Sequence, residues 1–234
     1  MITLSLDRVC FSVADMLKLG KKPGRHEPGR AMTAAADAAY NEGVSLLHLA
    51  ANIETYRKTG CGDNFVKIET ECGEEKLIIG SRAGLLMPAE EIAVAVATAG
   101  PDICAAIGKY AESGEAMAAF WLDRFGVMAL FELSAYVRGC VEEYASSRGW
   151  GVGPSMQPGA TVGWSITGQR ALYRLAGGNQ LGLRINDASM LIPQISDTVL
   201  IGIGPRYTSK KSRTLCVECE KYDECLWRRE NESE

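Results

Sequence analysis

The chain has 234 residues, of which 47% are hydrophobic and 23% charged, a composition typical of a globular protein with a sizeable core. Its net charge of −4 excludes non-specific nucleic-acid binding, which needs a basic surface. The most apolar stretch, Ile92 to Gly108, is too short to cross a bilayer as a helix. Asp7, Arg8 and Asp15 interrupt the apolar run that a signal peptide needs. We therefore expect a cytoplasmic protein without a membrane or nucleic-acid partner.

The N-terminal third of the chain predicts short helices followed by strands. Ser12 is a candidate N-cap for a helix through Lys18. Residues 30–41 predict a second, alanine-rich helix that ends at Gly43. The segments that follow predict extended chain at 44–56, a loop at 59–64, and strands at 65–70 and 76–79 joined by a turn.

Residues 92–97 have the pattern of a central strand. Isoleucine and valine alternate with alanine, so both faces are apolar and both are expected to be covered. The alanine face leaves room for a helix to pack closely. Gly100-Pro101-Asp102 then predicts the start of a helix that runs to about Ala111, because proline is favoured at the first helical position and an acid in the first turn.

The longest predicted helix begins at Ser113 and ends at Arg148, just before Gly149. Its apolar side chains recur at spacings of three and four, which predicts one buried stripe. The stripe comprises Leu122, Phe125, Ala129, Leu133, Val137, Cys140 and Tyr144. Asp123 and Glu132 lie next to the stripe. Each is either solvated or paired, or reaches the loop beyond the helix.

The segment from Pro154 to Trp164 predicts a shaped loop, because its prolines and glycines, with Gly151 and Gly153 before them, fit neither a helix nor a central strand. Such a loop either turns a corner or holds a ligand. It follows the long helix directly, so residues from several elements can converge on it. Beyond it we predict a helix at 165–176, a strand at 181–185, and a hairpin of 189–193 with 198–203.

Strands and helices are grouped along the chain rather than strictly alternating. This grouping predicts an α+β fold, with a mainly antiparallel sheet covered by a long central helix and shorter helices. We expect residues 1–205 to form a single domain and residues 206–234 to form a cysteine-containing C-terminal tail.

Three clustered cysteines in this tail carry a chemical signal. Cys216 and Cys219 have the CxxC spacing that lets one turn offer two sulfurs to an ion, and Cys225 adds a third thiol. A fourth ligand could be Cys61 or Cys72, a water, or a residue of a partner. The spacing fits zinc and an iron–sulfur cluster equally, and three unmetallated surface thiols are the alternative.

Common catalytic templates do not fit. The two histidines, His26 and His48, do not form an HExxH pair. The sequence has no P-loop, no GxGxxG between a strand and a helix, and no GxSxG elbow. We therefore assign no catalytic residue, and a stand-alone hydrolase or dehydrogenase is not expected.

The order of several short motifs points to a family. Met156-Gln157-Pro158-Gly159 is followed by Gly163-Trp164 and Gln169, then by Leu191-Ile192-Pro193 with Ser196, and finally by the three tail cysteines. In this order and spacing the chain resembles the cobalamin-dependent methionine synthase activation-domain family, in particular its free-standing members from anaerobes. The resemblance extends upstream through residues 97–100 and 122–126 and covers most of the chain from about Ile92.

The resemblance implies a corrinoid-protein activation or reactivation factor, accessory to a cobalamin-dependent methyltransferase. In that family the domain binds S-adenosylmethionine beside the Pro-Gly loop and presents it to cobalamin on a partner, for reductive methylation. The work is positioning rather than acid–base chemistry. By motif matching, the cofactor-binding residues are Glu132, Pro158, Gly159, Trp164 and Gln169, and the metal ligands are Cys216, Cys219 and Cys225.

This sequence departs from the family pattern at three positions. Ser155 and Ala160 stand where an arginine and a tyrosine are expected around the loop glycine, and Ile195 stands where a lysine is expected. An arginine would hold the ligand carboxylate in a bidentate pair. These departures leave two other hypotheses open. In the first, the protein is a non-catalytic module that docks a corrinoid protein or methyltransferase, and zinc only stabilises its tail. In the second, it is a self-contained S-adenosylmethionine-binding enzyme.

Overall fold

The computed structural model describes residues 1–18, 29–216, 222–223 and 225. The helices are α1 (Val13–Lys18), α2 (Arg30–Leu46), α3 (Pro101–Glu112), α4 (Ala116–Ser147) and α5 (Gln169–Leu175), with the 3-10 turns η1 (Ala83–Leu86), η2 (Ile166–Gly168) and η3 (Gly178–Leu181). The strands are β1 (Ile2–Leu6), β2 (Leu49–Cys61), β3 (Phe65–Thr70), β4 (Gly73–Ile78), β5 (Glu91–Thr98), β6 (Gly151–Met156), β7 (Arg184–Ile185), β8 (Leu191–Ile192) and β9 (Ser196–Gly204).

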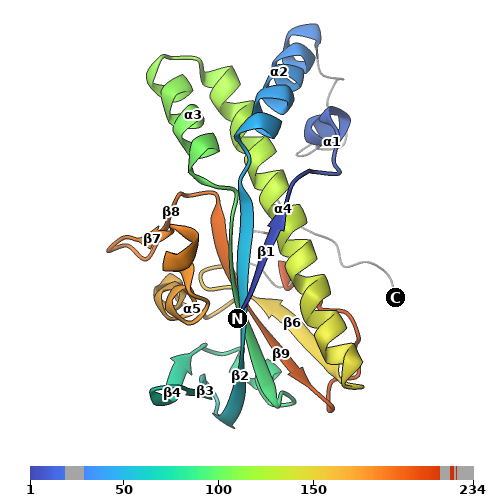
Figure 1. The fold of residues 1–234 in the computed structure, drawn as a ribbon, viewed down its shortest axis with the longest axis vertical. Helices are drawn as coiled ribbons and strands as arrows, with labels where there is room; N and C mark the ends of the chain where they lie inside the picture. The colour runs from blue at the N-terminus through green and yellow to red at the C-terminus, as the bar shows by residue number, and fades with distance from the viewer. Residues whose placement is uncertain (19–28, 217–221, 224, 226–234) are drawn as a thin grey trace.

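Most strands form one antiparallel sheet in the order β4-β3-β2-β5-β9-β6, and β1 also pairs with β2. The long strand β2 pairs with three strands: residues 49–53 pair with β1, residues 58–61 pair with β3, and residues 50–57 pair with β5. Strands β7 and β8 form a small separate ribbon. The predicted α+β class, a mainly antiparallel sheet with a long covering helix, is confirmed (Figure 1).

The alternation along β5 decides what covers each face of the sheet. Its alanines belong to one buried cluster with Leu122 and Phe125 of α4. Its isoleucine and valines belong to a second buried cluster with Leu172 of α5. Because a methyl side chain is short, the alanine face lets α4 lie close to the sheet, as predicted. Figure 1 shows α4 running the length of the molecule alongside the sheet.

Helix α2 is longer than predicted, because Gly43 does not end it and Val44 to Leu46 continue the helix. Gly43 is buried and faces Phe125 of α4, where an added Cβ would lie 2.3 Å from the ring carbon Cδ1. The ring of Phe125 also contacts those of Phe11 and Tyr40, edge to face, with centroids 5.3 and 5.4 Å away. This glycine therefore permits close helix packing rather than a helix stop.

The chain after α4 also differs from the prediction, because residues 151–156 form a strand, β6, rather than part of the loop. Strand β6 lies at the edge of the sheet, and its pairing with β9 shifts register between Val152 and Ser155. Pro154 lies within this irregularity, so its missing N–H costs no ladder hydrogen bond. The predicted 189–193 hairpin is also wrong, because β9 pairs with β5 and β6.

Several predicted boundaries move in the structure. Ser113 is the C-cap of α3, and Glu115 precedes α4. The apolar stripe of α4 is buried through Val137, but Tyr144 is 37% exposed. Strand β2 extends into the predicted 59–64 loop, β4 begins within the predicted turn, and the strand expected at 181–185 is reduced to β7. Within the described residues, no helix is both long and apolar enough to span a membrane.

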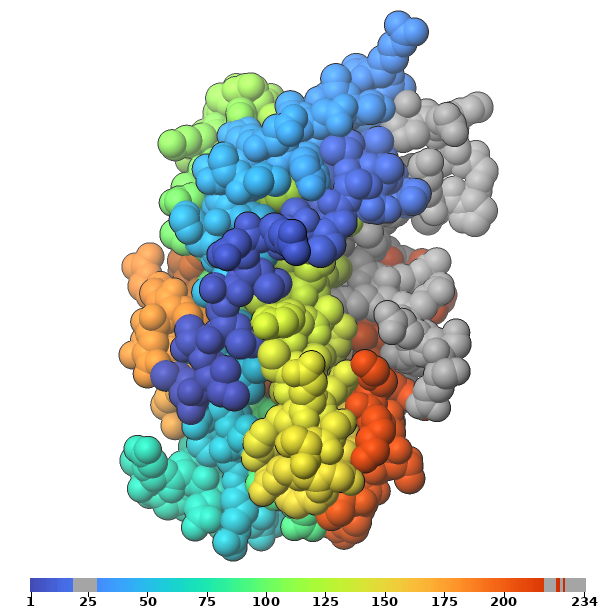
Figure 2. All heavy atoms as spheres, turned by 45° about the vertical axis from the view of Figure 1, so that its right-hand side comes forward, coloured from blue at the N-terminus to red at the C-terminus, as the bar shows by residue number. Residues whose placement is uncertain are grey.

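Residues 206–216 run back along β6. The backbone N–H groups of Val152 and Ser155 donate to the carbonyls of Ser209 and Arg213, at 2.9 and 2.8 Å. From the other side, Glu142 of α4 accepts a 2.8 Å hydrogen bond from the Ser212 N–H. Figure 2 shows these orange-red residues beside the C-terminal half of α4. The segment thus closes the space between α4 and β6.

Candidate functional site

A cavity of about 330 Å³ lies where α4, β9, the Pro-Gly loop and the C-terminal segment meet. Its lining residues are Leu130, Phe131, Ser134, Arg138, Ser155, Gln157, Pro158, Ala160, Thr161, Gln169, Asp197, Thr198, Val199, Thr214, Leu215, Cys216 and Cys225. Most of the wall is apolar, and charged side chains of both signs reach it. The expectation that several elements converge on the loop after α4 is therefore met.

Asp197, at the start of β9, places a carboxylate at the wall of this cavity. Its Oδ2 accepts a hydrogen bond from Gln157 Nε2 at 3.0 Å and lies 3.1 Å from Ser134 Oγ. The Ser134 hydroxyl is also 2.8 Å from the carbonyl oxygen of Leu130. Because it has one proton, it can serve either acceptor at a given moment. The loop and α4 together fix the position of this carboxylate.

Thr198, the next residue, has a buried hydroxyl without a partner. The residue is 1% exposed, and its Oγ1 has no hydrogen-bond partner among the described residues. A buried hydroxyl that makes no hydrogen bond costs roughly 1–3 kcal/mol. Since Thr198 lines the cavity, a polar group placed there could remove this cost.

Arg138 lines the cavity from α4. It lies one helical turn after Ser134, and its Nη1 is 3.4 Å from the Ser134 carbonyl oxygen. Ser134 and Arg138 are four positions apart, so both are on the same face of the helix. A guanidinium and the carboxylate of Asp197 therefore line the same mainly apolar space.

Ser155 and Ala160, two of the three departures from the family pattern, both line the cavity. Ser155 Oγ lies 2.8 Å from Ser212 Oγ, and Ser155 forms an isolated parallel bridge with Thr214. The side chain that stands in place of the expected arginine is thus bonded to the C-terminal segment. That segment forms a wall of the cavity beside Ser155.

The Pro-Gly loop is held in shape by hydrogen bonds between its own residues. The Gly159 N–H donates to the Trp164 carbonyl at 2.9 Å, and the Gln157 N–H donates to Thr161 Oγ1 at 2.9 Å. Gly159 has φ +78°, a conformation that glycine adopts without strain. Pro158 lines the cavity, whereas Gly159 is not among its lining residues. The glycine therefore shapes the loop, and the proline faces the space.

The other predicted site residues divide between two places. Gln169 is 8% exposed, donates to the Ser189 carbonyl at 2.8 Å, and lines the cavity. Trp164 lines a different cavity, on the far side of the loop. Glu132 lines neither, because its Oε2 accepts a 2.8 Å hydrogen bond from the Cys10 N–H near the N-terminus.

Two of the three predicted metal ligands lie in the described part of the chain. Cys216 and Cys225 both line the cavity, although eight residues separate them in the sequence. Cys219 lies outside the described residues. Within the described part of the chain, no group of three His, Cys, Asp or Glu residues could hold a metal ion.

Sequence reasoning missed Asp197, Thr198, Ser134 and Arg138. A usable signal existed for the first two, because Ser196-Asp197-Thr198 is a polar opening to an otherwise apolar strand. The second pair has the i, i+4 spacing of one helix face. Neither signal indicates a site until the strand and the helix are known to meet.

The described geometry can be compared with known proteins. No protein-family model and no curated protein matches the sequence. Among solved structures, the crystal structure of the MetH reactivation domain bound to AdoHcy matches with a TM-score of 0.64 and 12% identity, over 89% of this chain and 80% of that chain. The resemblance drawn from the motifs is thus confirmed at the level of the fold. This chain has the fold of the MetH reactivation domain.

Proposed function

We propose that this protein is an activation or reactivation factor for a corrinoid protein, and that it binds S-adenosylmethionine in the cavity beside Pro158. One support is the fold, which it shares with a domain whose crystal structure contains AdoHcy. The observation that carries the proposal is the unpartnered Thr198 hydroxyl, buried in a cavity wall that also presents Asp197 and Arg138.

The donor set of this cavity fits the amino-acid end of the ligand. The Asp197 carboxylate suits the ligand's ammonium group, and the Arg138 guanidinium suits its carboxylate. Arg138 on α4 would then take the role of the arginine that the family pattern places at the position of Ser155 in β6. The apolar wall, with Leu130, Phe131 and Val199, suits the uncharged remainder of the ligand.

The bound ligand would supply a methyl group, and the acceptor would be cobalamin on the partner, a corrinoid protein or cobalamin-dependent methyltransferase. The contribution of this chain is to hold the donor in place beside the partner's cofactor. Cys216, Cys219 and Cys225 would hold zinc or an iron–sulfur cluster next to this cavity, since Cys216 and Cys225 already line it.

Calorimetric titration of the full chain with S-adenosylmethionine and with S-adenosylhomocysteine tests the proposal. We expect both to bind, and we expect Asp197→Asn and Arg138→Met each to weaken binding about 10-fold or more, because each removes a charge-assisted hydrogen bond. Glu132→Gln is the matched control and should leave binding unchanged, because Glu132 faces Cys10.

Two results would contradict the proposal. If neither ligand binds, the remaining hypothesis is that the protein is a non-catalytic docking module. A stable complex with a corrinoid protein would then support that alternative. Weaker binding by Glu132→Gln, with unchanged binding by Asp197→Asn, would show that the ligand binds outside this cavity.

A further inference from the structure

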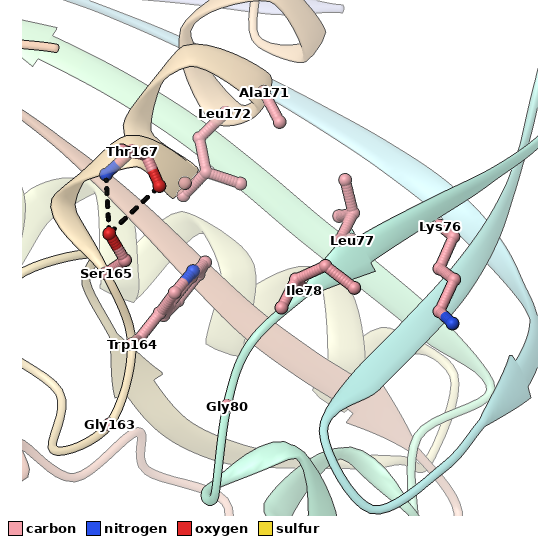
Figure 3. Close-up of a pocket in the computed structure, with 11 residues that line it drawn as sticks. Lys76, Leu77, Ile78, Gly80, Gly163, Trp164, Ser165, Thr167, Ala171 and Leu172 are labelled. Carbon is pink, nitrogen blue, oxygen red and sulfur yellow. Dashed lines mark hydrogen bonds between the residues drawn. The ribbon is translucent and has the colours of Figure 1, made fainter.

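A second cavity, of about 290 Å³, lies along the outer strand β4. Strand β4 forms one wall with Lys76, Leu77 and Ile78, and the segment from Gly163 to Leu172 forms the other. Figure 3 shows the two walls facing each other across this space. The Pro-Gly loop separates it from the cavity beside Asp197, since the two share no lining residue.

The indole of Trp164 has a hydrogen-bond donor with no acceptor. Trp164 is 4% exposed, and its Nε1 is buried without a partner among the described residues. The ring lines the second cavity, and Figure 3 shows the end of the ring that carries the nitrogen turned toward Leu172, another lining residue. A buried indole N–H normally finds an acceptor. The unpaired donor therefore indicates that a bound ligand supplies the acceptor.

The ring is held in place by close backbone contacts. A Cβ at Gly168 would lie 2.3 Å from Trp164 Nε1, and a Cβ at Gly80 would lie 1.9 Å from the Gly163 carbonyl oxygen. Only glycine permits these approaches. The backbone N–H of Trp164 donates to the Thr161 carbonyl at 3.0 Å. The donor is therefore fixed in position before any ligand arrives.

The other polar groups of this cavity decide the chemistry of its ligand. Ser165 Oγ accepts from the N–H and from the hydroxyl of Thr167, at 3.3 and 2.9 Å, so its own proton remains to be donated. No carboxylate is among the described residues that line the cavity. The ammonium of Lys76 lies 4.0 Å from the centroid of the Phe65 ring, and Figure 3 shows it turned away from Trp164. The available groups are thus neutral donors on an apolar wall.

We propose that this cavity is a second binding site, for a small, uncharged, mainly apolar molecule whose carbonyl oxygen or ring nitrogen accepts the Trp164 indole proton. The apolar part lies against Leu77, Ala171 and Leu172. Because no full charge is directed into the cavity, a charged ligand would lose its hydration without compensation. The site is independent of the proposed binding of S-adenosylmethionine.

The probe pair acetophenone and α-methylstyrene tests this site, since the two have the same shape and differ in a carbonyl against a methylene group. The measurement is the indole N–H spectrum of the nitrogen-15-labelled full chain, which has four tryptophans. Trp164→Phe identifies the Trp164 signal. We expect acetophenone to shift this signal saturably downfield and to bind about fivefold or more tightly than α-methylstyrene, because only acetophenone accepts the hydrogen bond.

Three controls keep the result specific. The indole nitrogen of Trp121 is also buried and has no partner within the described ranges, but Trp121 does not line this cavity, so its signal should stay in place. Ala171→Leu, which fills the cavity, should abolish the shift, and Thr198→Val, in the other cavity, should not. Equal affinity for the two probes, no saturable shift up to the solubility of acetophenone, or a shift that survives Ala171→Leu would overturn the proposal.

Discussion

The backbone of Gly43 in α2 lies against the ring of Phe125 in α4, so closely that a Cβ at Gly43 would be 2.3 Å from Cδ1 of the ring. We expect Gly43→Ala to lower the free energy of unfolding by about 1–3 kcal/mol, because the ring is held by Phe11 and Tyr40 and cannot move freely. Gly139→Ala, in α4, is the control. A Cβ there meets nothing within 4 Å, so helix propensity should raise stability by about 0.5–1 kcal/mol. Chemical denaturation of both variants measures the difference, and equal effects would refute this account of the packing.

Two threonines that line the cavity should respond in opposite ways to the same substitution. Thr198→Val should raise the free energy of unfolding of the ligand-free protein by about 1 kcal/mol, because the buried hydroxyl of Thr198 has no partner in the described part of the chain. Thr161→Val should lower it by about 1–2 kcal/mol, because Thr161 Oγ1 accepts the Gln157 N–H. If S-adenosylmethionine binds at this wall, Thr198→Val should also weaken its binding. A loss of stability in Thr198→Val would show that its hydroxyl already has a partner.

The pKa of Asp15 should reveal its hydrogen bonds with Ser12 at the N-terminus of α1. Hydrogen bonds from the side chain and backbone of Ser12 lower the pKa of Asp15 to about 2. The charged carboxylate is therefore favoured by folding, and its contribution to stability is present above the ordinary pKa of 3.8 and is lost as the pH falls toward 2. We expect Ser12→Ala to raise the pKa toward 3.8, as measured by an NMR titration of the Asp15 side chain. If the pKa of Asp15 is unchanged in Ser12→Ala, a group other than the Ser12 side chain lowers it.

The tail cysteines should hold a metal. We expect protein purified without oxygen to contain zinc, or iron with acid-labile sulfide, and we expect Cys216→Ser and Cys219→Ser each to lose it, because thiolates supply the ligands. Cys10→Ser is the control, since Cys10 is an exposed cysteine near the N-terminus that is not among the candidate ligands. Elemental analysis with an absorption spectrum distinguishes the two metals, and metal-free protein would leave three ordinary thiols.

The sequence was sufficient where a pattern depends on neighbours along the chain. The alternation of isoleucine and valine with alanine fixed β5 as a strand covered on both faces, because each face of a strand repeats every second residue. The period of three and four fixed α4 in the same way. The Pro-Gly loop and the approximate position of Gln169 also followed from the sequence, through the residues that cannot continue a helix or a strand.

The sequence was insufficient where a single residue's direction depends on packing. Glu132 was predicted to contact the ligand, whereas in the structure Phe131 lines the cavity and Glu132 accepts a hydrogen bond from the Cys10 N–H. Successive residues of a helix point about 100° apart, so a shift of one position changes which side of α4 a side chain faces. Only the contact of α4 with the sheet fixes this orientation.

The cavity itself was decided by tertiary structure alone. It exists because β9 pairs between β5 and β6, which brings Asp197 and Thr198 to α4, and because residues 206–216 return along β6 to close the space. These contacts join residues far apart in sequence, where no local period operates. Local periodicity thus determined β5 and α4, whereas long-range pairing determined which polar side chains share a site.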